Sequence, residues 1–104
     1  MIEKQSELNR LGDLIELEMK NIGLWNAELN LSENPKEAFG RESLKFEEWL
    51  QAVFLPNLRI SVSQNKFPTK SQVAIAAIRN FDGLNSADEL INLLSQVDDI
   101  INNT

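Results

Sequence analysis

The side chains able to do chemistry in this chain are carboxylates, amines, guanidinium groups and hydroxyls, because its 104 residues include no histidine, cysteine or tyrosine. Histidine is the commonest general acid and base near neutral pH and the commonest metal ligand. Lack of both histidine and cysteine excludes Ser-His and Cys-His nucleophiles, imidazole and thiolate metal sites, and disulfides. We therefore expect the domain to have no enzymatic activity by itself and to need no cofactor or metal.

Carboxylate pairs are the remaining candidates for acid–base or divalent-metal chemistry. They are Asp13 with Glu16, Glu47 with Glu48, and Asp98 with Asp99. None has EF-hand spacing, and a dimetal carboxylate site would need Glu-x-x-His. Such charges usually face solvent, which is what we expect of these pairs. Glu47 is the exception to watch, because a helical wheel places it with Gln51 between two apolar stripes, where a half-buried acid would be a site candidate.

Charge is distributed unevenly along the chain, whose net charge is −6 and whose isoelectric point is about 4.6. Residues 49–81 hold no acid and four bases, Arg59, Lys66, Lys70 and Arg79. Residues 82–104 hold five acids and no base, and residues 1–48 hold six bases and eleven acids. This basic segment is the surface most able to attract RNA phosphates or an acidic partner. The alternative is local, since Arg59, Lys66 and Arg79 lie near expected helix C-termini, where the helix dipole favours cations and acidic neighbours neutralise them.

An aromatic residue lies inside the basic segment. Phe67 stands between Lys66 and Pro68 in an expected turn, and an aromatic beside a cation is a common interface anchor. The partner-binding candidates are therefore Arg59, Lys66, Phe67, Lys70 and Arg79. The alternative is that Phe67 packs inward and that the apolar run Val73–Ile78 is simply buried. The acidic isoelectric point favours a protein partner, with direct contact to RNA or a nucleotide as the alternative.

The first two elements that must position these residues are helices. Apolar residues at three- and four-residue steps predict a helix over about 3–22 that ends at Gly23. Residues 24–42 predict a long loop pinned to the core by Trp25 and Phe39. A second helix begins near Ser43 as N-cap and places Trp49 and Val53 in the core, and Pro56 predicts either a kink or a break into two helices.

Two more helices complete the chain. Thr69-Lys70-Ser71-Gln72 has capping-box spacing ahead of a short helix from Val73, although six apolar residues in a row also suit a buried strand. A second capping box at 86–89 precedes a last helix, one wide face of which is lined by apolar residues from Leu90 to Ile101. The sequence therefore predicts an all-α fold, a small up-and-down four-helix bundle with a long loop between helices 1 and 2 and a proline kink in helix 2, forming one domain over residues 1–104.

The expected cellular location follows from two kinds of segment that the sequence does not show. No apolar stretch approaches the roughly 20 residues that span a bilayer. The first residues lack the apolar run and cleavage site of a secretory signal. We expect a cytoplasmic protein without membrane contact, and the pattern leaves its oligomeric state open.

The run Glu48-Trp49-Leu50-Gln51-Ala52-Val53-Phe54-Leu55-Pro56, preceded by Trp25, Phe39 and Leu44, resembles the YqcC-like family of small bacterial proteins. The resemblance covers most of the chain and implies a small helical bundle whose biochemical role is unknown. The family is often labelled after tRNA pseudouridine synthase C, which implies association with that enzyme. Pseudouridine synthases need a larger α/β domain and a catalytic Asp in an Arg-Leu-Asp-type loop, and Arg10-Leu11-Gly12-Asp13 is one residue too long for it.

The residues and the resemblance together predict a non-catalytic interaction or accessory module, associated through the resemblance with a tRNA pseudouridine synthase. The alternative is an accessory protein that contacts RNA or a nucleotide through the local basic patch.

Overall fold

The computed structural model describes residues 3–28 and 45–103, and over these ranges its regular structure is entirely helical. The elements are α1 (Lys4–Asn21), α3 (Phe46–Trp49), the π-helical turn η1 (Leu50–Phe54), α4 (Leu55–Gln64), α5 (Val73–Asn80), the 3₁₀ turn η2 (Asn85–Ala87) and α6 (Asp88–Asn102). Of the described helices, none has the length and apolar character needed to cross a membrane.

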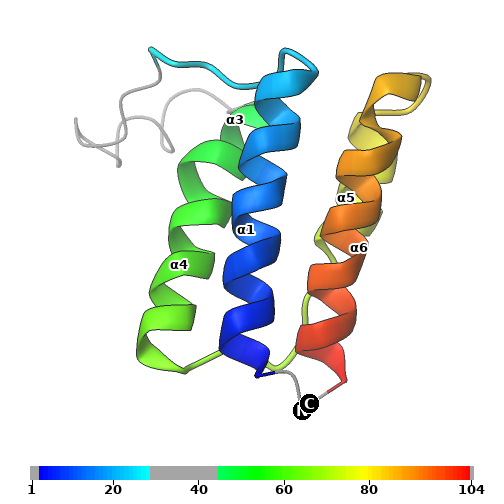
Figure 1. The fold of residues 1–104 in the computed structure, drawn as a ribbon. Coiled ribbons are helices and arrows are strands. Elements are labelled where there is room, and N and C mark those ends of the chain that lie inside the picture. Colours follow the sequence, from blue (N-terminus) through cyan, green and yellow to red (C-terminus); the bar gives the residue numbers. More distant parts are fainter. Residues whose placement is uncertain (1–2, 29–44, 104) are drawn as a thin grey trace.

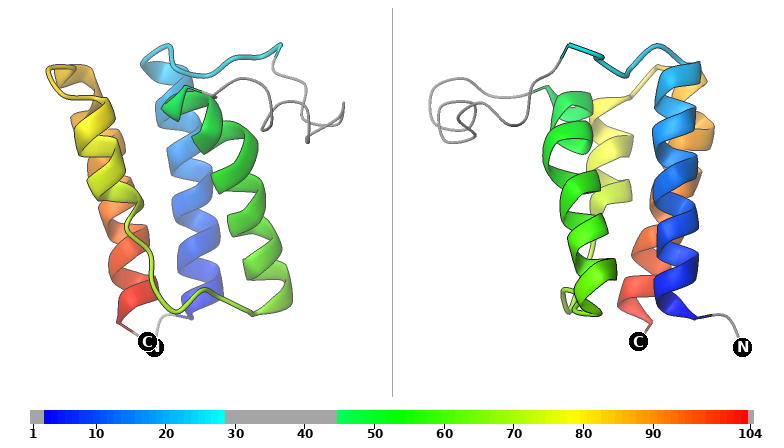
Figure 2. Two further views of the ribbon diagram at one scale, coloured as in Figure 1. Left: turned by 180° about the vertical axis from the view of Figure 1, so that it is seen from behind. Right: turned by 60° about the vertical axis from the view of Figure 1, so that its left-hand side comes forward.

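The helices run up and down, as the sequence predicts, and α1 lies at the centre (Figure 1). It packs against α4 on one side and α6 on the other, and α5 packs against α6 (Figure 2). Within the described residues α4 and α5 make no extensive contact with each other.

The core is built from the apolar stripes that the sequence shows. On α1 the four fully buried side chains recur at three- and four-residue steps, which places them on one helical face. They are Leu8, Leu11, Ile15 and Met19. The facing stripe on α6 has the same spacing and consists of Leu90, Leu94, Val97 and Ile101. Because each stripe is buried against the other, the α1–α6 pair forms the centre of the hydrophobic core.

Pro56 disturbs the second helix without breaking it. The backbone is right-handed helical at both Phe54 and Leu55, so the alternative of two separate helices is wrong. Just before the proline the helix widens, and the Leu55 N–H donates to the Leu50 carbonyl five residues back. Proline has no N–H and its ring crowds the carbonyl four residues earlier, and a π turn relieves both constraints.

The π turn also changes which side chains point inward. Leu50 and Gln51 are buried, whereas Trp49 and Val53 are only half-buried. Trp49 packs against the core from its edge, so the expectation that both residues belong to the core is confirmed in part for Trp49, and it is wrong for Val53. The extra residue in the wide turn rotates the helix faces relative to a regular pattern of 3.6 residues per turn, on which the prediction from spacing depends.

The helix starts differ from the expected capping boxes. Within the described chain, α5 begins at Val73 without a side-chain cap from residues 69–72, and α6 follows η2 with Ala87, not Ser86, in the N-cap position. Ser43 and Phe39 lie outside the described residues. The second helix is described from Phe46, where the Glu48 carboxylate accepts a 3.0 Å hydrogen bond from the Lys45 N–H. Trp25 packs against the core, as expected.

Candidate interaction groove between α4 and α5

An apolar groove of about 170 Å³ lies where the second helix, the connector 65–72 and the end of α6 meet. It is here called the α4–α5 groove, after the two helices that the connector joins. Aromatic and aliphatic side chains from α3, η1, α4, the connector and α6 form most of its wall. The lining residues are Trp49, Phe54, Asn57, Leu58, Ser61, Phe67, Pro68, Ser71 and Ile101. The connector 65–72, which is not a regular helix, therefore forms one border of the groove, and α4 and the end of α6 form others.

Stacked rings form one wall of the groove. The Trp49 ring lies 5.8 Å from that of Phe46 and 5.9 Å from that of Phe54, centroid to centroid. Phe46 also meets Phe81, in the turn after α5, edge to face at 5.3 Å. Ring pairs at these separations attract each other beyond their area of burial. The contact across to Phe81 fixes the upper end of the wall against α5.

Phe67 lies in the connector and forms part of the opposite wall. Its side chain is half-buried, and the Lys4 ammonium lies 4.5 Å from the centre of its ring. A cation over an aromatic face is held by the ring quadrupole. Nearby, the Gln5 side-chain amide donates to the Val62 carbonyl at 2.9 Å, which ties the start of α1 to the end of α4. Phe67 is thus neither fully displayed nor fully packed inward.

The connector is anchored by two polar residues of α6. The buried Asp98 carboxylate accepts hydrogen bonds from the Ser71 hydroxyl at 2.5 Å, the Val73 N–H at 3.1 Å and the Ala74 N–H at 2.8 Å. Asn102 binds Ser71 twice, accepting its N–H and donating to its carbonyl, both at 2.8 Å. Asp98 therefore caps α5 from another helix, and the expectation that it faces solvent is wrong.

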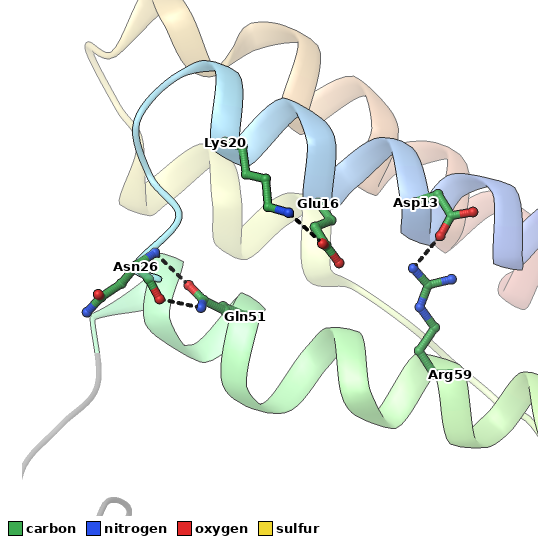
Figure 3. A network of polar contacts seen from close by, with 6 residues as sticks. All are labelled: Asp13, Glu16, Lys20, Asn26, Gln51 and Arg59. Carbon is green, nitrogen blue, oxygen red and sulfur yellow. Dashed lines mark hydrogen bonds and ion pairs between the residues drawn. The ribbon is translucent and has the colours of Figure 1, made fainter. Parts of the chain in front are cut away.

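Arg59 does not belong to the groove. Its guanidinium donates to the Asp13 carboxylate at 2.6 Å and to the Asn9 side-chain and backbone oxygens at 2.7 and 3.1 Å (Figure 3 shows the Asp13 contact). The group lies directly over Gly12, where an added Cβ would be 3.0 Å from the guanidinium carbon. Arg59 is thus held between α1 and α4.

The other candidate residues are divided between two ends of the molecule. Lys66 and Lys70 are exposed, bracket Phe67 and Pro68 in the connector, and have no ion-pair partner among the described residues. Arg79 is also exposed, but it lies in the last turn of α5, far from the connector. The structure therefore groups Lys66, Phe67 and Lys70, and it separates Arg59 and Arg79 from them.

The acid of interest, Glu47, is half-buried, and the buried polar group on the same helix is Gln51. The Gln51 side-chain amide accepts a hydrogen bond from the Asn26 N–H at 2.9 Å and donates one to the Asn26 carbonyl at 2.7 Å (Figure 3). These two bonds hold the chain after α1 against the π turn. Across residues 3–28 and 45–103, no cluster of three or more His, Cys, Asp or Glu side chains could hold a metal ion.

Sequence reasoning missed Lys4, Ser71 and Asp98 as parts of this region. Nothing in the local sequence pattern links Lys4, at the start of α1, to Phe67, which lies in the connector after α4. Asp98 did carry a signal, because it falls four residues after Leu94 and three before Ile101, on the apolar face of the last helix. An acid on a buried face needs several hydrogen-bond donors, and a helix N-terminus supplies them.

Comparison with known proteins gives the same family as the resemblance carried by residues 48–56. The model of a family described as tRNA pseudouridine synthase C matches residues 7–100. No curated protein and no solved structure gives a match. The family match spans all of the described helices except the first residues of α1 and the last of α6. The chain belongs to the YqcC-like family, a family of unknown function that carries this description.

Proposed function

We propose that this domain is a non-catalytic interaction module that docks an acidic, apolar segment of a partner protein in the α4–α5 groove. The observation that supports it best is the grouping of Lys66, Phe67 and Lys70 at the edge of a groove walled by Trp49 and Phe54. An apolar side chain of the partner would fill the groove. Carboxylates beside it would meet the two lysines.

Charge argues for an acidic partner segment. The chain as a whole carries −6, so it repels acidic surfaces over most of its area. Lys66, Lys70 and Lys4 form a local exception, and a complementary local charge mainly speeds association and selects the orientation of docking. Since salt screens exposed charges beyond about 10 Å at 0.1 M, the association should weaken as salt is added.

The family description suggests which partner to test first. We infer an association with a tRNA pseudouridine synthase, and this inference rests on that description alone. Lack of cysteine suits a cytoplasmic site of action for such a pair.

The test is affinity purification from the native host with the tagged wild-type domain and with a Lys66→Glu/Lys70→Glu double variant. Both lysines are exposed, so the variant should keep the wild-type circular dichroism and thermal midpoint while it loses the captured partner. A matched control, Lys45→Glu/Arg79→Glu, changes the net charge equally at exposed positions outside the groove and should retain capture. Undiminished capture by the first variant would contradict the proposal.

The alternative function is direct contact with RNA or a nucleotide through the same lysines. It is disfavoured because Arg59 is occupied by Asp13 and Arg79 lies apart, which leaves few cations on one surface. Phosphate contacts supply most non-specific affinity for nucleic acids. A salt-sensitive gel shift of tRNA by the wild-type domain, lost in Lys66→Glu/Lys70→Glu, would support this alternative.

A further inference from the structure

A second hollow of about 340 Å³, with both polar and apolar walls, lies at the turn between α5 and α6. Ile78, Leu84 and Ile91 contribute apolar surface to it, and Asp82 and Asp88 stand beside them. Ile78 and Leu84 are 55% and 41% exposed and line the same hollow, so they form a small apolar patch on the surface. The charge of this hollow is therefore opposite to that of the α4–α5 groove.

The turn that carries Leu84 is held in a fixed shape. The Leu84 N–H donates to the Phe81 carbonyl at 2.9 Å, and the Ala87 N–H donates to the Leu84 carbonyl at 3.0 Å. Gly83 between them has a φ of +82°, a conformation that side chains of other residues rarely adopt. Phe81 is buried beneath the turn. Leu84 is thus presented on a rigid support, so docking it costs little conformational entropy.

We propose that the α5–α6 turn of one copy of this chain docks in the α4–α5 groove of a second copy. Leu84 enters the apolar groove, and Asp82 and Asp88 face Lys66 and Lys70 of the other copy. The groove volume of about 170 Å³ equals roughly five or six water molecules, which is room for one branched aliphatic side chain. The inference rests on the proposed function, because it uses the same groove, and it names a second copy as an occupant.

The contact must be between molecules. The connector with Lys66 and Lys70 and the α5–α6 turn lie at opposite ends of α5, whose eight residues span about 12 Å (Figure 2). The segregation of charge noted in the sequence, bases in 49–81 and acids in 82–104, supplies the complementarity for such a head-to-tail contact. Each pair then leaves one groove and one turn unused, so assembly is open-ended and competes with partner docking at the groove.

Complementation between two variants tests this contact. Leu84→Asp removes the docking side chain, and Lys66→Glu/Lys70→Glu inverts the groove charge; all three positions are exposed, so both variants should fold. Sedimentation velocity at low salt should show wild-type mass rising with concentration and each variant alone as a monomer. An equimolar mixture should form dimers and nothing larger, because each variant retains one competent surface.

Several outcomes would overturn the inference. They are a wild-type domain that stays monomeric at the highest attainable concentration, a variant that associates like wild type, and a mixture that stays monomeric. Ile60→Asp is the matched control, since Ile60 is 52% exposed on α4 and should leave association unchanged. If self-association fails while Lys66→Glu/Lys70→Glu still abolishes partner capture, the proposed function stands and this inference alone is refuted.

Discussion

The two seams on either side of α4 use basic residues in opposite ways. At the α1–α4 seam, Arg59 is engaged by Asp13 and Asn9, and its guanidinium covers Gly12. At the α4–α5 seam, Lys66 and Lys70 have no such partner among the described residues, and the aromatic groove beside them stays open. A basic side chain that holds two helices together is unavailable for binding a partner. Lys66 and Lys70, which are exposed, are therefore better candidates for a binding site than Arg59.

The largest effect should come from the core, not from the groove. Leu50→Ala empties a fully buried position and should lower the free energy of unfolding by about 3–5 kcal/mol. Trp49→Ala, one residue earlier, should cost about 1–2 kcal/mol, because its half-buried ring already borders solvent in the groove. Urea denaturation of both variants measures the ranking. A costlier Trp49→Ala would mean that the groove is closed in solution.

Asp98 should have the next largest effect. Asp98→Ala leaves two N–H groups at the start of α5 and the Ser71 hydroxyl without their acceptor, which should cost about 2–3 kcal/mol. Hydrogen exchange should show faster opening of α5 than of α1 in this variant. Asn102→Ala is the matched control, and its smaller loss should stay confined to the connector.

A smaller effect is expected at the α1–α4 seam, where the Arg59–Asp13 pair is partly exposed. Arg59→Ala should cost about 1 kcal/mol. Gly12→Ala should be nearly neutral in the wild type, because the gain in helix propensity is offset by displacement of the guanidinium. In the Arg59→Ala background the same change should stabilise by up to about 1 kcal/mol. Additive effects in this double-mutant cycle would show that Gly12 and Arg59 do not interact.

The smallest effect concerns an exposed pair on the free face of α1. A hydrogen bond from Arg10 lowers the pKa of Glu7 below its ordinary value of 4.5. Because the folded pKa is depressed, the stabilising contribution is present above the unfolded pKa and is lost as pH falls through the folded pKa. Arg10→Ala should return the pKa of Glu7 toward 4.5, as an NMR titration of its carboxyl would show. Stability at neutral pH should change far less than in Arg59→Ala.

Local patterns predicted most of the fold. The stripes of α1 and α6 lie where three- and four-residue spacing places them, and Gly23 ends the first helix with a φ of +79°. The candidate site was predicted less completely. Lys66, Phe67 and Lys70 are close in sequence and are grouped, whereas Lys4 and Trp49 reach the same region through tertiary packing.

The sequence by itself determined the helical class, the order of the helices, the apolar stripes and the segregation of charge, because each depends on spacing within a few turns of one chain segment. Only the tertiary structure decided that Asp98 caps α5, that Arg59 is held by Asp13 and that the π turn at Pro56 buries Gln51 instead of Trp49. Those outcomes depend on which donors and acceptors from distant segments meet, since a buried polar group takes whichever partner the packing of neighbouring helices brings within hydrogen-bond distance.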